Sequence, residues 1–359
     1  MSSKEPKEHG GFILVLVLWV LLALTIAASA LAAWVARTTD QAVLLADERR
    51  GQIDVADTLE TLKFLLATRP SRAGGLYLGP APKALVSGWR RDPFEFHRAE
   101  NGSKDLPLDG RHWRGLGEAG FTLQDESGLI NAHAGDRGII TNVLDQWDIS
   151  AIEARRLIDN LSAYISPFGN STASLEYRAA GLPAPPQRYL LAPLEVANVL
   201  GWHELAGSDL ARGWSRRVSV LRGGAFNPNV APLDVLELHP SIGRRRASRL
   251  LSERATRPFT SAQNVLQRTG VRLDPLQLVL VDGEVIRVEL GVASSGVAWH
   301  YTLRLTSGSD GGRPWRLGNA HPISGEVIEH HSATSDGSTR SARVEHPLFT
   351  PPPEHDSGP

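Results

Sequence analysis

An apolar run near the amino terminus constrains this chain more than any other feature. Residues 12–35 read FILVLVLWVLLALTIAASALAAWV, and only Thr25 and Ser29 interrupt the apolar side chains. As a helix this run is about 36 Å long at about 1.5 Å per residue, which is enough to cross a bilayer core of about 30 Å. The sequence therefore predicts a single membrane-spanning anchor. It favours this anchor over an export signal that is cut after Ala28-Ser29-Ala30.

The helix that begins in this run is predicted to continue well past the membrane. Residues 37–68 contain no proline, and Gly51 is their only glycine. One face of this stretch carries apolar residues at helical spacing, namely Val55, Leu59, Leu62 and Leu66. Pro70 then ends the helix. We therefore expect one helix over residues 12–68, whose second half is amphipathic and packs on the rest of the chain.

The composition excludes several classes of protein. The chain has 359 residues with 38 basic and 39 acidic side chains, so its formal net charge is −1. This balance excludes a polybasic nucleic-acid coat. The absence of cysteine excludes disulfide scaffolds, zinc-thiolate sites, iron–sulfur clusters and thiol nucleophiles. With 42% hydrophobic residues the chain can bury a core, and its length suggests two or three folded units.

The region after the long helix is predicted to mix strands and helices. We expect strands near Trp113 and at residues 120–123, 218–221, 285–290 and 299–305. We expect helices at residues 139–147, 152–165, 190–202, 244–254 and from 258 onward. Residues 168–188 are rich in Gly, Pro and Ser and should form a long loop.

A tight turn between two of these helices resembles the turn of a helix-hairpin-helix, or SAM-like, unit. Its characteristic residues are Pro240, Ile242 and Gly243, and glycine suits a turn in which two helices meet so closely. Such units often bind DNA phosphates, and a run of arginines surrounds this turn: Arg244, Arg245, Arg246, Arg249, Arg254 and Arg257. A membrane-anchored DNA-binding protein is therefore the main alternative. We favour a solvated helical face, because a fold alone does not establish function.

No catalytic constellation stands out along the chain. The histidines, including His321 and His330-His331, lack metal-ligand spacing, and no Gly-x-Ser-x-Gly elbow occurs. Asp125 and Glu126 are adjacent but have no partner histidine in the pattern, so they suggest no reaction. We expect no enzymatic activity and no cofactor.

The amino terminus resembles the class III leader of type IV pilins and of type II secretion pseudopilins. A short polar leader ends in Gly11, and Phe12 then opens the apolar helix. The resemblance implies that a prepilin peptidase cuts between Gly11 and Phe12 and methylates the new amino terminus. Most members of the family carry Glu at the fifth mature position, where this chain has Leu16. This departure resembles the K branch of the minor pseudopilins of type II secretion.

The physical chemistry of the filament core agrees with Leu16 in a subunit at the tip. A carboxylate buried among apolar helices is costly unless it pairs with a neighbouring amine. A subunit at the very tip has no subunit above it to supply that amine. Leucine therefore suits a cap better than a repeating subunit of the shaft.

The resemblance to the K pseudopilin covers nearly the whole chain and implies an α+β fold. A long amino-terminal helix would pack on an antiparallel sheet, and a large helical domain with two SAM-like parts would be inserted. The segments that carry this resemblance are residues 125–131, 193–201 and 226–270. The implied division is a leader (1–11), a transmembrane helix (12–35), its amphipathic extension (36–68), a pilin-like part (69–124), a first SAM-like part (125–214), a strand (215–224), a second SAM-like part (225–272), returning strands (273–346) and a disordered tail (347–359).

Calcium is the one metal that the resemblance raises, because an acidic loop binds it in some members of the family. The candidate ligands in this chain are Asp159, Asn170 and Glu176. Calcium takes six to eight oxygen ligands, usually with several carboxylates. These three residues supply few carboxylates, so the sequence does not favour a calcium site.

The resemblance also implies a cellular place and a set of partners. The chain would be anchored in the inner membrane with its carboxyl-terminal domain in the periplasm, and it would then occupy the tip of the pseudopilus. Its partners would be the I and J types of minor pseudopilin, the prepilin peptidase and secreted substrate proteins. DNA is not expected as a partner.

Overall fold

The computed structural model describes residues 10–78, 105–133, 137–166, 173–205, 209–221, 223–281, 283–292, 297–306 and 314–324. The chain divides into two compact units, residues 1–53 and residues 54–359. The long helix α1 (Gly10–Thr68) contributes to both units. The expected single helix over residues 12–68 is thus confirmed. Residues 1–9 of the expected leader (1–11) and the expected tail from 347 lie outside the described residues, whereas residues 10 and 11 belong to α1.

The first unit is the apolar half of α1. Among the described residues, α1 is the one helix that is long and apolar enough to cross a membrane. Its apolar side chains from Leu14 to Val35 are all exposed. The two polar side chains of this stretch bond to the helix itself: Thr25 Oγ1 donates to the Leu21 carbonyl, and Ser29 Oγ donates to the Thr25 carbonyl at 2.8 Å. These bonds satisfy both hydroxyls within the helix, as an apolar surrounding requires.

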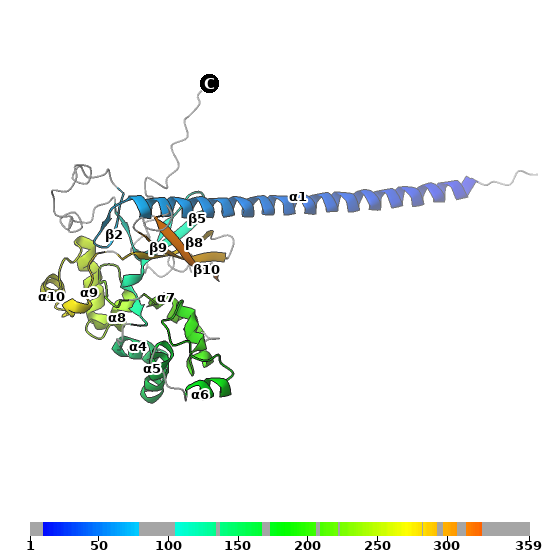
Figure 1. Ribbon diagram of the computed structural model, residues 1–359. Helices are drawn as coiled ribbons and strands as arrows, with labels where there is room; N and C mark the ends of the chain where they lie inside the picture. Colours follow the sequence, from blue (N-terminus) through cyan, green and yellow to red (C-terminus); the bar gives the residue numbers. More distant parts are fainter. Residues whose placement is uncertain are drawn as a thin grey trace, which may run out of the picture. The chain divides into compact units, whose positions relative to one another are not determined.

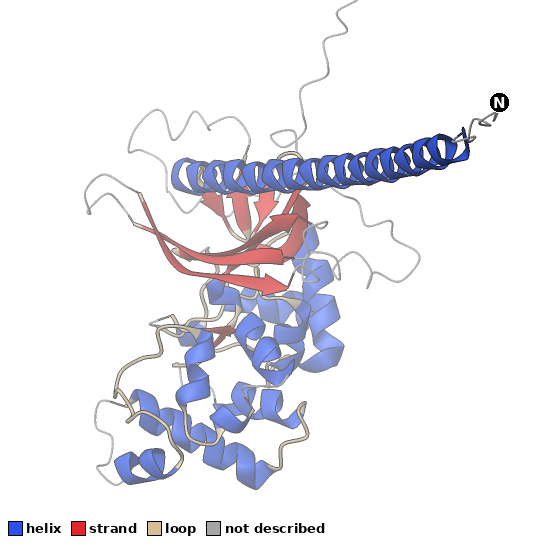
Figure 2. Ribbon diagram, turned by 90° about the vertical axis from the view of Figure 1, so that its right-hand side faces the viewer, coloured by secondary structure: helices blue, strands red, loops and turns tan. Residues whose placement is uncertain are grey.

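The second unit is built around an antiparallel sheet, whose strands are red in Figure 2. The five strands of this sheet follow the order β10-β9-β8-β5-β4. The other strands of the described residues form a three-stranded sheet, β1-β2-β3, and a short parallel pair, β6 with β7. Their bounds are β1 Ser71–Arg72, β2 Gly75–Tyr77, β3 Asp105–Pro107, β4 Asp109–Arg114, β5 Ala119–Asp125, β6 Ile130–Asn131, β7 Val218–Ser219, β8 Val285–Val292, β9 Val297–Leu305 and β10 Trp315–Ser324.

Among the described residues, the shorter helices lie in the sequence between β5 and β8, although these two strands are neighbours in the sheet (Figure 1). The α-helices are α4 Arg137–Asp145, α5 Ala151–Ile165, α6 Ala173–Ala179, α7 Asp209–Arg217, α8 Leu233–Leu238, α9 Gly243–Thr256 and α10 Ala262–Thr269. Short 3-10 turns occur at Glu126–Gly128 (η1), Pro193–Asn198 (η2), Trp202–Glu204 (η3) and Pro275–Gln277 (η4). The helical region is therefore an insertion within the sheet, and the α+β class is confirmed.

The last part of α1 packs on one face of the five-stranded sheet. Leu59, Leu62 and Leu66 are buried, and Val55 packs against the same cluster while half-buried. The cluster also contains sheet residues such as Phe121, Leu123 and Val288. Leu65 is equally buried in it, so the apolar face is wider than the sequence pattern indicated. Burial of a leucine side chain stabilises a fold by about 1.5–3 kcal/mol, so this face anchors the helix firmly.

The opposite face of the sheet carries the inserted helices, which form two apolar clusters of their own. One cluster joins α4, α5, α7 and the segments around η2 and η3. The other joins α8, α9 and α10. Strand β8 is consequently buried on both faces, and its burial includes the charged residue Arg287.

Several expected elements differ from the structure. Residues 168–188, expected as a loop, contain α6, because buried Tyr177 stacks 6.2 Å from Tyr164. Residues 190–202, expected as a helix, form only 3-10 turns, and Gly201, with a φ of 83°, lies between the two turns. Residues 215–217 belong to helix α7 rather than to the expected strand, and only residues 218–219 of that strand are formed.

Candidate functional site

The predicted processing site lies at the beginning of α1. Gly11 and Phe12 are within the first turn of the helix, which starts at Gly10. Leu16 lies one turn further along, and its side chain is 53% exposed. The cut itself stays a prediction.

A turn at one end of the sheet is held by two side chains of α1. The backbone N–H of Leu116 donates to Thr58 Oγ1 at 3.0 Å, and the N–H of Glu118 donates to Asp54 Oδ2 at 3.0 Å. Gly117 lies between them with a φ of 54°, and a Cβ at this position would lie 2.1 Å from Asp54 Oδ2. These contacts fix how the long helix meets the sheet, since both donors would otherwise lack an acceptor.

Sequence reasoning did not find this contact. Asp54 and Thr58 are four residues apart, and they flank the apolar stripe on which the helix packs. The one indication in the sequence was that two short polar side chains lie beside a helix face that is predicted to be buried. The sequence does not indicate that these side chains accept hydrogen bonds, because the donors are 58 and 64 residues away along the chain.

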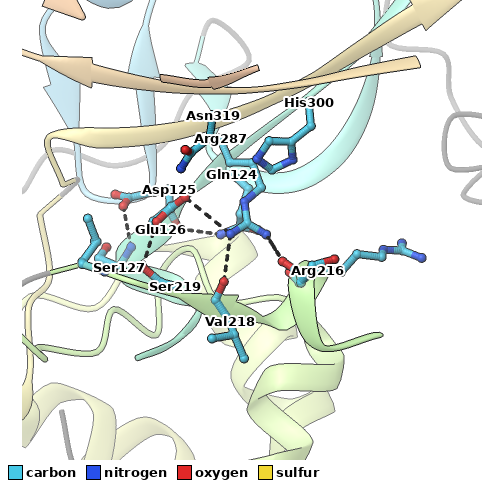
Figure 3. Close-up of polar contacts among 12 residues, drawn as sticks. Gln124, Asp125, Glu126, Ser127, Arg216, Val218, Ser219, Arg287, His300 and Asn319 are labelled. Carbon is cyan, nitrogen blue, oxygen red and sulfur yellow. Dashed lines mark hydrogen bonds and ion pairs between the residues drawn. The ribbon is translucent and has the colours of Figure 1, made fainter. Parts of the chain in front are cut away.

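A buried polar junction joins the sheet to the inserted helices (Figure 3). Arg287 on β8 pairs with Glu126 at 3.4 Å, and both side chains are at most 5% exposed. The same guanidinium donates to the carbonyl oxygens of Ser215 at 2.7 Å, Arg216 at 3.1 Å and Val218 at 2.9 Å. It therefore binds the carboxyl-terminal end of α7, where a positive charge is favourable.

Glu126 extends the junction to the short strand β7. Its Oε2 accepts a hydrogen bond from Ser219 Oγ at 2.8 Å, while its Oε1 faces Arg287. Glu126 follows β5 directly, so one carboxylate connects β5, β7 and β8. A buried pair of this kind adds little net stability as a whole, but removal of one partner leaves an uncompensated charge.

The Asp125 side chain joins the two ends of the helical insertion. Its side chain is buried and accepts hydrogen bonds from the backbone N–H groups of Ser127 and Gly283. Gly283 immediately precedes the return to β8, and a Cβ there would lie 2.8 Å from Asp125 Oδ1. Burial raises the pKa of the Asp125 carboxyl above its usual range, and the two N–H donors only partly offset this effect.

A second link joins the sheet to α9. Arg254 Nη1 donates to the carbonyl oxygens of Pro228 at 2.9 Å and Ala231 at 2.6 Å, and Nη2 lies 3.4 Å from Asp109 on β4. Burial disfavours the ionised form of Asp109, but Arg111 and Arg254 outweigh burial and hold its pKa below the usual range. Burial lowers the pKa of Arg254 to about 10. Arg254 is thus a structural residue, and its expected place among the exposed arginines was wrong.

The turn between α8 and α9 is compact. The N–H groups of Ile242 and Gly243 both donate to the His239 carbonyl at 3.0 Å. Gly243 has a φ of 67°, Ile242 is buried in the cluster of α8, α9 and α10, and Pro240 is exposed. Exposed arginines follow on α9: Arg244, Arg245, Arg246 and Arg249. Arg244 lies 3.6 Å from Glu237.

The candidate calcium ligands do not come together in the part of the chain that the structure describes. Asp159 on α5 pairs with Arg137 at 2.8 Å. Glu176 is exposed on α6, and Asn170 lies outside the described residues. Among the described residues, no group of three or more His, Asp or Glu side chains is placed to hold a metal ion.

Comparisons with known proteins find similarity among solved structures. No protein-family model matches the chain, and no curated protein matches its sequence. Among solved structures, a chain of the GspK-GspI-GspJ complex from the enterotoxigenic Escherichia coli type 2 secretion system is similar, with 14% sequence identity and a TM-score of 0.47. The alignment covers 80% of this chain and 99% of that chain.

Proposed function

We propose that this chain is the minor pseudopilin that caps the tip of a type II secretion pseudopilus and supports protein export across the outer membrane. The observation that carries this proposal is the construction of α1. An uninterrupted helix begins at Gly10, next to the Gly11–Phe12 junction, is apolar enough to span a membrane, and then packs its last part on an antiparallel sheet. A subunit that moves from a membrane into a filament needs both halves in one helix.

The inserted helices support a role at the tip. Helices α4 to α10 form a large body between the neighbouring strands β5 and β8. The Arg287–Glu126 pair and the Arg254–Asp109 pair join this body to the sheet at two separate points. Such bulk suits a cap that no further subunit follows. Leu16, which replaces the usual charged residue of a shaft subunit, agrees with this position.

The proposed role is mechanical rather than enzymatic, and it requires no cofactor. The perturbed pKa values in the junctions have structural causes: burial raises the pKa of Asp125, and the guanidinium groups of Arg111 and Arg254 lower the pKa of Asp109. We place the globular unit in the periplasm, with the I and J types of minor pseudopilin, the prepilin peptidase and secreted proteins as partners. Asp159, Asn170 and Glu176 are not assigned to calcium.

The first experiment tests the pilin class through the amino terminus of the membrane-extracted protein. We expect intact mass and sequencing to give a mature chain that starts at N-methylated Phe12, only in cells that contain the prepilin peptidase. Gly11→Leu should block this cut, whereas Gly10→Ala, one residue earlier, should leave it. An unprocessed Met1, or a cut after Ala30, would contradict the proposal.

A second experiment tests the tip. We expect antibody-gold labelling of overproduced pseudopili to find this chain at one end of each filament. Labels spread along the filament would assign the chain to the shaft. A mature Phe12 together with such spread labels would retain the pilin class and reject the cap.

A membrane-anchored DNA-binding protein is the second candidate, and the exposed arginines beside the compact turn of Gly243 favour it. Charge reversal at Arg244, Arg245 and Arg246 should abolish DNA retention if this candidate is right. The same variant should assemble with pseudopilins as the wild type does if the chain caps a pseudopilus. Gel-shift and co-purification assays on one preparation distinguish these outcomes.

A further inference from the structure

Three ionisable side chains lie side by side on three neighbouring strands of the five-stranded sheet. Glu289 on β8 is opposite His300 on β9, and His321 on β10 is opposite His300 on its other side. Directly opposite residues share a face of a sheet, so the three side chains form one row. His300 Nδ1 lies 3.5 Å from Glu289 Oε1, and the His300 ring stacks 4.5 Å from the ring of His321. We call His300 and His321 the histidine pair.

The surroundings of the inner histidine disfavour a positive charge. His300 is 8% exposed, and the Arg287 side chain projects beside it toward the inserted helices (Figure 3). Burial lowers the pKa of His300 below its ordinary value of 6.5, and the contact with Glu289 opposes this effect only in part. The nearby cations, Arg287 and His321, lower this pKa further. His300 therefore binds a proton more weakly in this arrangement than in water.

The acidic member of the row keeps its charge while the histidines gain theirs. Burial raises the pKa of Glu289, but the contact with His300 and the charges of Arg287 and Arg216 outweigh burial and hold this pKa below its usual range. Histidine gains its charge at about pH 5–8. Arg216 belongs to α7, so the inserted helices add a second cation to this side of the sheet. Acid therefore adds positive charge to a site that already contains two arginines.

The outer histidine is connected to the inserted helices by two successive contacts. His321 Nδ1 lies 3.0 Å from the carbonyl oxygen of Asn319, and the side-chain amide of Asn319 donates to the Leu191 carbonyl at 3.2 Å. Asn319 lies in the bulge of β10 and has a φ of 47°. Leu191 belongs to the insertion and precedes η2. A displacement of His321 is therefore passed on to the contact between β10 and the insertion.

This contact can open while the other links between sheet and insertion persist. The hydrogen bond from Asn319 to Leu191 is exposed. The Arg287–Glu126 and Arg254–Asp109 pairs described above are buried. An exposed hydrogen bond is exchanged for bonds to water at little cost, whereas the opening of a buried ion pair is costly.

We propose that the histidine pair is an acid-sensitive switch, which releases β10 from the inserted helices when both rings are protonated. Two charged imidazoles whose centres lie 4.5 Å apart repel each other, and release of β10 allows His321 to move away from His300. Neutral His300 supports the closed contact above pH 6.5, and this support is lost as the pH falls from 6.5 through the lowered pKa. The inference goes beyond the proposed function and does not depend on it.

Distances between spin labels test the switch in the full-length chain in detergent. The chain contains no cysteine, so two introduced cysteines alone carry the labels. Exposed positions 317 on β10 and 194 in η2 span the contact, whereas positions 152 on α5 and 194 both lie in the insertion.

We expect the population with a longer 317–194 distance to rise at least about threefold between about pH 7.5 and about pH 5.5, and to return when the pH is restored. The 152–194 distance should stay the same. A 317–194 distance that does not respond to pH would overturn the inference. An equal change in the 152–194 distance would also overturn it, because the insertion itself would then be unfolding.

Matched substitutions identify the titrating groups. His300→Asn and His321→Asn each keep a polar atom near the position of Nδ1 and remove the charge, so each should reduce the rise to less than about 1.5-fold. His203→Asn is the control and should keep the full rise, because His203 lies in η3 and its Nδ1 contacts the Gly201 N–H at 3.2 Å.

Circular dichroism at both pH values verifies that each variant is folded. If buried His300→Asn does not fold, His321→Asn still tests the pair, since His321 is half-buried. A full rise in a folded His300→Asn or His321→Asn variant would reject the histidine pair as the switch. Loss of the rise in His203→Asn would reject it as well.

Discussion

The backbone N–H of Glu118 donates to the carboxylate of Asp54 at 3.0 Å, and this bond joins the long helix to the turn between β4 and β5. Asp54 is also the first residue of the second compact unit. The neighbouring bond from Leu116 to Thr58 lies one helical turn further on.

The contribution of this bond can be measured with Asp54→Ala. The variant leaves the N–H of Glu118 without its acceptor, so we expect the free energy of unfolding to fall by about 1–2 kcal/mol. Asp57→Ala is the matched control, because Asp57 is an exposed carboxylate on the same helix and the helix propensity changes equally. Urea unfolding measures the free energy of unfolding, and amide hydrogen exchange at Glu118 reports whether its N–H is still hydrogen-bonded. Equal effects from the two variants would contradict a role for the bond.

Gly117→Ala should break the same hydrogen bond, between the Glu118 N–H and Asp54, by steric displacement of the carboxylate. A Cβ at this position meets Asp54 Oδ2 at 2.1 Å, so the carboxylate must move and release Glu118. Gly181→Ala is the control for backbone strain, because Gly181 also has positive φ, 71°, but has nothing within 4 Å of its Cβ. We expect Gly117→Ala to cost about 1–2 kcal/mol more than Gly181→Ala. The excess should vanish in the Asp54→Ala background, and its persistence there would reject this explanation.

Arg287→Met tests the polar junction. The change leaves Glu126 buried without a cation, so we expect a loss of about 3–5 kcal/mol in the free energy of unfolding. Arg304→Met on the next strand is exposed and should change it by less than about 0.5 kcal/mol. The double variant Glu126→Gln with Arg287→Met should cost less than the sum of the single changes. A small effect of Arg287→Met in denaturant unfolding would show that the junction is not coupled to folding.

The pH dependence of stability should separate the two buried aspartates. The folded-state pKa of Asp125 is raised above 3.8, so its contribution is present at low pH and is lost as the pH rises through that raised pKa. The folded-state pKa of Asp109 is lowered below 3.8, so its contribution is present above 3.8 and is lost as the pH falls through the lowered value. The stability difference between wild type and Asp125→Asn should therefore shrink with rising pH. The difference for Asp109→Asn should grow with rising pH, and slopes of equal sign would refute this assignment.

The elements that could be predicted from the sequence are those with a strong local pattern. The long helix follows from its apolar run, and α5 and α9 follow from apolar residues at helical spacing. Helix α7 was not predicted, because it contains Gly213 and is stabilised by contacts with residues that are remote in the sequence. The ring of Trp214 lies 4.7 Å from that of Trp202 and 6.4 Å from that of Trp147.

For related reasons, the sequence predicted neither the polar junction nor the bounds of strand β10, which lies within the expected returning strands (273–346). The strand contains glycine and proline, which weaken a local strand pattern, and its pairing with β9 determines its conformation. The junction joins Glu126 to Arg287, which are 161 residues apart in the sequence. Adjacent carboxylates at 125 and 126 gave no chemical signal, because their partners are backbone groups, the Ser219 hydroxyl and an arginine that only the tertiary fold brings near.

The position of the helical insertion also has a consequence for the order of folding. Strands β5 and β8 pair along their whole length, yet Asp125 and Gly283, where the insertion leaves and re-enters the sheet, are 158 residues apart. Closure of a flexible loop of this length costs about 4–5 kcal/mol of chain entropy. If the helices form first, their ends already lie close together and most of this entropy has been lost before the strands meet. The helical body would then serve as a template that brings the two halves of the sheet into register.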